Sequence, residues 1–403
     1  MKVFAVPVIA SALTAALSVV FFVELARTYG DSTLARIIMI QATAALVQII
    51  TIPSSWVYLL GANGRREVVE RYSEGQAVEW AGIAVGTVFV LAGGAIAGGR
   101  AAGLLVAFLS LAVAASSSCL GYLRATADWR RYVTWVLMPN LIRLPLIWAT
   151  PLLMRKGILP DLSHDVAAIV ACFFLVPELC RLAAIYMPLA AKTFEWQGVR
   201  RTLAGARHIL HNWLFDLGSA LTDQADKLLV GALLGPQILV TYFFGRRLGS
   251  LAVMVTEPVY VELYRRMLTG AAPVTAWRTW LKGLGAAFAL WAMMASMVGF
   301  LVLTPAAVRY LPDAVVAFVG VLLSVMLLDS LSAANRWSRY LAQAANHSAM
   351  LLAFRLSVFA VFAASLAALA RPFPVWGVVL AMLASLACET AYLGRLHGSE
   401  ARR

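Results

Sequence analysis

Charged side chains within long apolar stretches are the residues of this sequence with the clearest chemical potential. Four arginines hold such positions, namely Arg143, Arg246, Arg247 and Arg355. A guanidinium group stays charged at every relevant pH and can hold two oxygens of a phosphate or carboxylate in a bidentate fork. Two interpretations follow: the arginines line a cationic cavity that binds an anion, or each pairs with an acid and holds helices together.

Arg143 stands between Pro139 and Pro145. Each proline removes a backbone hydrogen bond, and a membrane interior tolerates the freed carbonyl only where protein or a water-filled cavity satisfies it. The pattern therefore predicts an interrupted helix around Arg143 and a binding site close to this arginine.

Acidic residues at helical spacing form a second set. Asp216, Ser219, Asp223 and Asp226 follow one another at intervals of three, four and three residues, which places them on one helical face. Asp223 and Lys227 are spaced for an i, i+4 ion pair. This face is therefore expected to serve either ion coupling or helix pairing.

Three further acids occupy apolar segments. Glu178 and Arg181 follow Pro177 and are spaced for a local ion pair. Asp329 and Glu389 have no basic residue at such a spacing and are candidate proton carriers.

The composition determines where these residues must lie. The 403 residues are 62% hydrophobic and only 13% charged, whereas soluble domains are about half apolar and about a quarter charged. This excludes a soluble enzyme and predicts an all-α integral membrane protein. The net charge of +13 comes mostly from Lys and Arg between the apolar segments, so it reports topology rather than a nucleic-acid interface.

Charged and Gly/Pro breaks divide the chain into about twelve expected membrane spans, each long enough to cross a bilayer. They run roughly over 3–27, 34–60, 78–98, 101–125, 132–153, 166–190, 208–234, 238–262, 281–304, 314–343, 348–370 and 374–396. With the N-terminus inside, the cytoplasmic segments hold 20 Lys and Arg residues against seven on the other side, which are Arg27, Arg36, Arg100, Arg155, Lys156, Arg309 and Arg371. The positive-inside rule then places both termini in the cytoplasm.

An internal repeat relates the two halves of the chain. A shift of 205 residues aligns five positions of the first half, Gly30, Leu34, Leu46, Thr51 and Pro53, with Gly235, Leu239, Leu251, Thr256 and Pro258. An even number of spans in each half gives both copies the same orientation. We expect two six-helix bundles, over 1–190 and 208–403, joined by a cytoplasmic linker over 191–207.

Other chemistry receives little support. The four cysteines, Cys119, Cys172, Cys180 and Cys388, fall in apolar runs without a metal-ligand spacing, and the sequence contains no phosphate-binding glycine loop or HExxH motif. We therefore expect no metal, no cofactor and no enzymatic activity. The short outer loops make a membrane-embedded glycan-modifying enzyme the least favoured alternative.

Three segments resemble a known family. The stretch ADKLLVGALLGPQILVTYFFGRRLGSLAVMVTEPV resembles the seventh and eighth spans of the polysaccharide flippases in the multidrug/oligosaccharidyl-lipid/polysaccharide (MOP) exporter superfamily, and its matching residues are Asp226, Lys227, Gly231, Gly235, Pro236 and Tyr242. The stretch ELARTYGDSTLARIIMIQATAALVQIITIP is similar to the first and second spans, and YLRATADWRRY to the inner turn between spans four and five.

The resemblance implies a V-shaped pair of six-helix bundles that works by alternating access. It also implies that the protein flips an isoprenoid-pyrophosphate-linked oligosaccharide, as used for O-antigen and lipopolysaccharide assembly, to the outer leaflet of the bacterial cytoplasmic (inner) membrane. The implied partners are this lipid-linked oligosaccharide, membrane lipids and other glycan-assembly proteins, without nucleic acid. A proton or sodium gradient is the candidate energy source.

Residue roles follow for this flippase hypothesis. The four arginines, Arg143, Arg246, Arg247 and Arg355, would bind the pyrophosphate in a central cavity. Ion coupling or helix pairing would fall to Asp216, Asp223, Asp226, Lys227, Glu178 and Asp329. The alternative is an ion-coupled drug or cation antiporter of the same superfamily, which would need carboxylates that face a cation.

The predicted orientation can be tested by cysteine labelling. In a background without native cysteines, a single cysteine at Gly99 should react with a membrane-impermeant maleimide in intact cells, because Gly99 lies in a predicted outer loop. A cysteine at Gly198 should react only after permeabilisation. Labelling of the Gly198 variant in intact cells would contradict the orientation.

Overall fold

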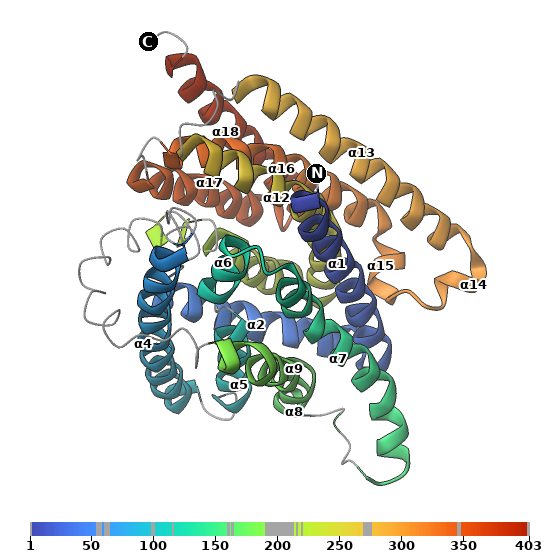
Figure 1. Cartoon of the computed structure of the whole chain (residues 1–403). Coiled ribbons are helices and arrows are strands. Elements are labelled where there is room, and N and C mark those ends of the chain that lie inside the picture. The colour runs from blue at the N-terminus through green and yellow to red at the C-terminus, as the bar shows by residue number, and fades with distance from the viewer. Residues whose placement is uncertain are drawn as a thin grey trace. The chain divides into compact units, whose positions relative to one another are not determined.

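The computed structural model describes residues 2–53, 59, 65–97, 101–114, 117–158, 162, 165–189, 213–214, 217–218, 221–268, 276–344 and 348–400. Its regular elements are all helices in this part of the chain (Figure 1). Within the described ranges, eight helices are long and apolar enough to cross a membrane, and Val319–Ala333 and Gly377–Leu393 are shorter apolar helical segments. The prediction of an all-α membrane protein is confirmed.

Every predicted span coincides with helical residues. The span expected at 208–234 is described as helix over 221–234, and the linker expected at 191–207 lies outside the described residues. Contacts between residues divide the chain into two compact units, Met1–Phe21 with Arg36–Gln224 and Phe22–Ala35 with Ala225–Arg403. The bundle boundaries expected from the sequence stay a prediction.

The first unit takes most of its helices from the N-terminal half. They are α1 (Lys2–Tyr29) as far as Phe21, α2 (Asp31–Thr51) from Arg36 onward, α4 (Arg65–Ala97), α5 (Ala101–Ala114), α6 (Ser117–Ala125), α7 (Trp129–Arg155), α8 (Val166–Val170), the π-helical turn η2 (Ala171–Leu175), α9 (Val176–Arg181) and a second π-helical turn η3 (Leu182–Tyr186). A core cluster that includes Tyr72, Tyr132 and Trp135 joins α4, α6, α7 and η3.

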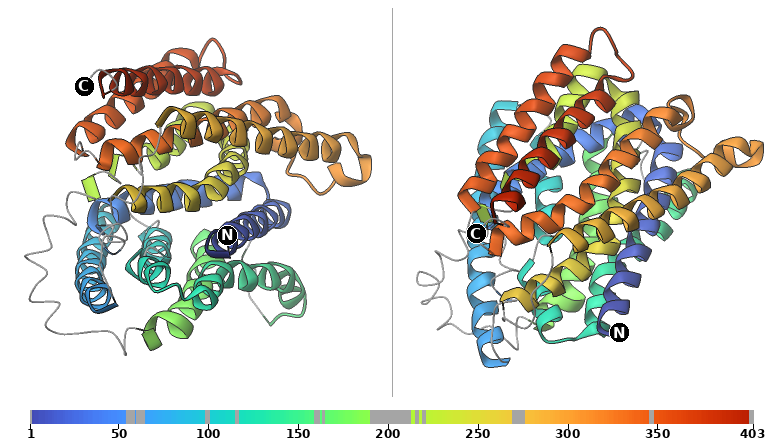
Figure 2. Two further views of the ribbon diagram at one scale, coloured as in Figure 1. Left: turned by 45° about the horizontal axis from the view of Figure 1, so that its top comes forward. Right: turned by 90° about the horizontal axis from the view of Figure 1, so that it is seen from above.

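The second unit is built on α12 and α16, which pack against each other along their length. Its elements are the helical residues 225–234, α12 (Pro236–Leu268), α13 (Ala276–Leu303), α14 (Pro305–Val308), α15 (Asp313–Ala317), α16 (Val319–Ala344), α17 (Ser348–Leu369) and α18 (Gly377–Glu400), together with residues 22–35. Helices α17 and α18 lie side by side, as the red helices of Figure 2 show.

Two sequence expectations are wrong. Helix α4 begins at Arg65, so most of the loop expected over 61–77 is helix; Val68 and Tyr72 at 6% and 0% exposure anchor this first part in the core. Helix α7 runs without a break through Pro139, Pro145 and Pro151. Each proline removes only one backbone hydrogen bond, a loss that membrane helices tolerate, so the prolines do not interrupt this helix.

The repeat is supported by matched turns. Gly30 and Gly235, which the 205-residue shift aligns, have φ angles of +82° and +85°, a region that favours glycine. Each carbonyl accepts a hydrogen bond at 3.1 Å from the aligned leucine, Leu34 or Leu239. The same backbone turn therefore starts the second helix of each aligned pair.

Glycines allow close helix approach in both units. A Cβ atom on Gly82 of α4 would lie 2.3 Å from the Thr51 carbonyl oxygen of α2. A Cβ atom on Gly245 of α12 would lie 2.7 Å from Cγ1 of Val325 on α16. Small residues at such crossings let membrane helices pack by close backbone contact.

We predict that Gly82→Ala and Gly245→Ala each destabilise the protein, because the new methyl group overpacks the crossing at a cost of about 1 to 3 kcal/mol. Gly299→Ala is the matched control, since nothing lies within 4 Å of a Cβ atom there. The measurement is the thermal unfolding midpoint of the detergent-solubilised protein. Equal midpoints for the three variants would contradict these crossings.

Candidate functional site

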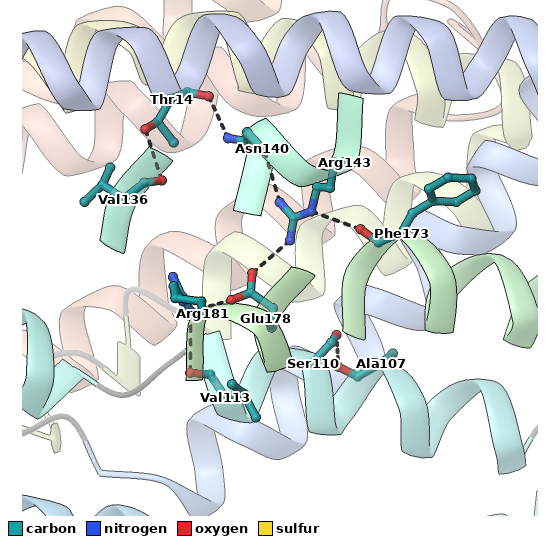
Figure 3. Close-up of polar contacts among 10 residues, drawn as sticks. All are labelled: Thr14, Ala107, Ser110, Val113, Val136, Asn140, Arg143, Phe173, Glu178 and Arg181. Atoms are coloured by element: carbon teal, nitrogen blue, oxygen red, sulfur yellow. Dashed lines mark hydrogen bonds and ion pairs between the residues drawn. The ribbon is translucent and has the colours of Figure 1, made fainter. Parts of the chain in front are cut away.

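The first candidate site surrounds Arg143 on α7 (Figure 3). Its Nη2 lies 2.9 Å from Oε1 of Glu178, its Nη1 donates to Oδ1 of Asn140 at 3.1 Å, and its Nε donates to the Phe173 carbonyl at 3.0 Å. Glu178 also meets Arg181, whose Nη2 lies 2.5 Å from Oε2. One buried carboxylate thus faces two guanidinium groups.

Proline chemistry explains the third of these bonds. Pro177 has no N–H, so the Phe173 carbonyl four residues earlier loses its usual helical donor. Arg143 supplies a donor in its place. Phe173 itself lies in the π-helical turn η2, and such turns are frequent at functional sites.

Aromatic rings and a second polar link complete the surroundings of this network. The Arg181 guanidinium lies 4.2 Å from the Trp135 ring centroid, within cation–π range. Asn140 donates to the Thr14 carbonyl at 3.0 Å, and the Thr14 hydroxyl donates to the Val136 carbonyl at 3.3 Å. These two bonds tie α1 to α7, as Figure 3 shows.

The second candidate site lies in the second unit and centres on Arg246 of α12. Its Nη1 lies 3.1 Å from Oδ2 of Asp226, and its Nε lies 3.0 Å from Oδ1 of Asp329 on α16. The Tyr242 hydroxyl donates to Asp226 at 2.5 Å. The two carboxylate side chains are only 6% and 7% exposed, against 23% for Arg246. One guanidinium therefore bridges two buried acids on different helices.

A third ion pair joins α17 and α18. Nη1 of Arg355 lies 3.0 Å from Oε1 of Glu389, and the two side chains are 9% and 4% exposed. Close by in the sequence, Asn335 of α16 donates to the Thr390 hydroxyl at 3.3 Å, and Phe354 stacks on Tyr392 at 3.9 Å between ring centroids.

The structure sorts the predicted residues into these groups. Glu178 and Arg181 form the expected local pair. Asp329 and Glu389, expected as lone acids, are instead bonded to arginines on other helices; sequence spacing could not show this, because the partners are distant in the chain.

The remaining predicted residues lie on or near the seventh predicted span and α12. The Arg247 guanidinium lies 5.7 Å from the Phe22 ring centroid. Asp223 and Lys227 are partly buried and lie one helical turn apart. Asp216 and Ser219 lie outside the described residues.

Sequence reasoning missed a buried polar face on α4. Gln76 and Glu79 are 1% and 2% exposed. The backbone N–H and the hydroxyl of Ser118 on α6 donate to the two Glu79 carboxylate oxygens, at 2.8 and 2.5 Å. The helical spacing of Tyr72, Gln76 and Glu79 could have revealed this face. It was overlooked because residues 61–77, between two predicted spans, were interpreted as a loop. No group of three His, Cys, Asp or Glu residues suited to a metal ion occurs in the described ranges.

Comparison with solved structures identifies the architecture. No protein-family model matches the sequence, and no curated protein matches it. The MATE multidrug transporter DinF-BH superposes with a TM-score of 0.64 at 13% identity over 98% of this chain and 95% of its own. The chain has the fold of the MATE transporters.

Two further structures agree. A mutant of the Vibrio cholerae MATE transporter VcmN gives a TM-score of 0.61 at 14% identity, with 100% of this chain and 96% of that chain covered. A MOP superfamily transporter from Pyrococcus furiosus, whose binding pocket is described as having reverse polarity, gives a TM-score of 0.57 at 14% identity, with the same coverage. The fold of these structures therefore spans the whole chain.

The buried ion pairs predict that replacing different arginines lowers the stability of the protein by different amounts. Arg355→Leu should destabilise the protein by about 3 to 5 kcal/mol, because Glu389 loses its ion-pair partner inside the second unit. Arg143→Leu should cost less, since Arg181 still meets Glu178. The double variant Arg355→Leu/Glu389→Leu should recover most of the loss.

Thermal unfolding midpoints and folded yield in detergent measure these costs. Arg27→Leu is the control, because its pair with Glu24 is partly exposed, with side chains 38% and 21% accessible, and should contribute at most about 1 kcal/mol. Equal losses for Arg355→Leu and Arg27→Leu would contradict a structural role for the buried pair.

Proposed function

We propose that the protein is an ion-coupled antiporter that exports an organic cation across the bacterial inner membrane. The observation that carries the proposal is the sharing of Arg246 between Asp226 and Asp329. The fold shared with MATE transporters supports the transporter class. As part of this proposal, both termini lie in the cytoplasm, as the distribution of Lys and Arg predicts.

The bridge gives a physical route to coupling. Arg246 holds one acid from residues 225–234 and one from α16, so neutralising either carboxylate with a proton weakens one of these two ion pairs. The guanidinium then favours the remaining acid, and the contact between these helices changes. A bound ion thereby acts on helix packing through one side chain, as coupling requires.

Paired arginines weigh against the predicted cationic cavity. Arg143, Arg246 and Arg355 each use guanidinium nitrogens to bind a carboxylate of the protein. A pyrophosphate would have to displace these bonds to reach the same nitrogens.

Lipid-linked oligosaccharide flipping is the second candidate function. The observation that favours it is the excess of positive charge in the first unit, where the guanidinium groups of Arg143 and Arg181 both bond the single carboxylate of Glu178. An anion could use the second guanidinium without leaving the acid unbonded. The sequence resemblance to polysaccharide flippases points the same way.

Transport by reconstituted protein separates the two functions. Proteoliposomes with an imposed pH or sodium gradient should accumulate a fluorescent organic cation such as ethidium, and uptake should collapse when the gradient is dissipated. Gradient-independent flipping of a fluorescent isoprenoid-pyrophosphate oligosaccharide, with no cation uptake, would contradict the antiporter and establish the second candidate.

Asp226→Asn and Asp329→Asn should each lower gradient-driven uptake by about tenfold or more, because an amide cannot exchange a proton or balance Arg246. Glu24→Gln is the matched control, since it makes the same chemical change in the partly exposed pair with Arg27. Initial uptake rates are compared at equal amounts of folded protein. Unchanged rates for both aspartate variants would contradict the coupling role of the Arg246 bridge.

A further inference from the structure

The crossing of α12 and α16 lies directly beside the Arg246 bridge. Gly245 and Gly249 stand one helical turn apart on α12, on either side of Arg246 in the sequence. Both glycines are buried. The Ser330 hydroxyl of α16 donates to the Gly249 carbonyl at 3.5 Å, so the backbone of α12 contacts α16 at this point. Glycines spaced by four residues commonly allow such close contact between membrane helices.

The two glycines face different groups of α16. A Cβ atom on Gly249 would lie 2.6 Å from Cβ of Asp329 and 3.0 Å from its Oδ2. A Cβ atom on Gly245 would instead lie 2.7 Å from Cγ1 of Val325. Each would also approach a backbone carbonyl oxygen of α16, at 2.9 and 3.1 Å respectively. Gly249 therefore faces an acid of the Arg246 bridge, whereas Gly245 faces an apolar side chain.

The geometry of the ion pair depends on this close approach. Nonbonded carbon atoms prefer a separation of about 3.5 to 4.0 Å, so a methyl group on Gly249 would push Asp329 away from α12 by about 1 Å. Oδ1 of Asp329 lies 3.0 Å from Nε of Arg246, and Oδ2 of the same carboxylate faces Gly249. A shift of this size would take the carboxylate out of hydrogen-bonding range of the arginine.

The internal repeat associates the glycines with the bridge. The 205-residue shift aligns residues 245–249 with residues 40–44 of α2, where Ile40, Gln41 and Ala44 stand in place of glycine, arginine and glycine. The aligned helix of the first half therefore lacks both the arginine and the two glycines. The glycines occur in the half that builds the bridge.

We propose that Gly249 is a positioning residue of the Arg246 bridge. Because it has no side chain, α16 approaches α12 closely enough for the Asp329 carboxylate to bond Arg246. The consequence for transport rests on the proposed antiporter function; the positioning of the ion pair does not.

A double-mutant cycle on thermal unfolding midpoints in detergent tests the positioning without transport. Arg246→Gln and Asp329→Asn, alone and together, give the part of the midpoint shift that the two residues share. This shared shift should fall by about half or more in Gly249→Ala protein, because the ion pair is stretched. It should keep its wild-type value in Gly245→Ala protein, the matched control. Equal shared shifts in all three backgrounds would overturn the proposal.

A second pair of variants tests the contact itself, even if Gly249→Ala alone gives no folded protein. Asp329→Gly removes the side-chain atoms that a methyl group on Gly249 would meet. Gly249→Ala should therefore lower the folded yield less in the Asp329→Gly protein than in the wild type. Gly245→Ala should lower the yield equally in both. An equal loss from Gly249→Ala in the two backgrounds would also overturn the proposal.

Uptake measurements connect the position of Asp329 to transport. At equal amounts of folded protein, Gly249→Ala should lower gradient-driven uptake of ethidium by about tenfold or more, and Gly245→Ala by no more than about twofold. Asp329→Glu, with a side chain longer by one methylene, should restore uptake in the Gly249→Ala protein, which a general packing defect would not allow. Wild-type uptake by the Gly249→Ala protein would contradict the positioning role.

The positioning role and the antiporter function fail in different ways. A shared midpoint shift that depends on Gly249, in a protein that takes up no organic cation, would keep the positioning role and remove the antiporter. Gradient-driven uptake together with a shared shift that does not depend on Gly249 would remove the positioning role and leave the antiporter intact.

Discussion

A charge inside an apolar protein must meet an opposite charge close by, and this requirement determines how the helices of both units are joined. Removing water from an isolated ion costs far more than any single packing contact contributes. Arg143, Arg246 and Arg355 satisfy the requirement by bonding acids on other helical elements of the same unit. Each ion pair links two helical elements, and apolar side chains pack around the linked elements.

Buried ion pairs occur at equivalent places in the two halves of the repeat. Arg143 and Glu178 join the fifth and sixth predicted spans and are 35 residues apart, while Arg355 and Glu389 join the eleventh and twelfth and are 34 apart. The equivalent helix pairs of the two halves thus each carry one Arg–Glu bridge. Together with the matched turns at Gly30 and Gly235, this favours descent of both halves from one six-helix ancestor.

Apolar run length and charged breaks were sufficient to predict the helices, because a membrane span needs a continuous apolar segment. The failures have local causes. The start of α4 at Arg65 was missed because its first turns carry Glu67, Glu70 and Arg71 in surface pairs, which resemble a loop in composition.

The partners of the buried charges could not be predicted from the sequence. Local spacing correctly paired Glu178 with Arg181, which are three residues apart. It could not pair Arg246 with Asp329 or Arg355 with Glu389, since only tertiary packing brings these residues together. Local sequence also failed for α7, which runs on through Pro139, Pro145 and Pro151 although each proline removes a backbone hydrogen bond.

The bridges differ in the exposure of their arginine and in the number of acids within its reach. Arg355 and Glu389 form a pair with both side chains below 10% exposure, so breaking it would separate two buried opposite charges. Arg246 is 23% exposed and has an alternative acid within reach whichever bond it loses. Neutralising one of its acids leaves Arg246 bonded to the other acid. The proposed antiporter function requires one such exchangeable contact among contacts that stay fixed, and in the described residues the Arg246 bridge best meets that condition.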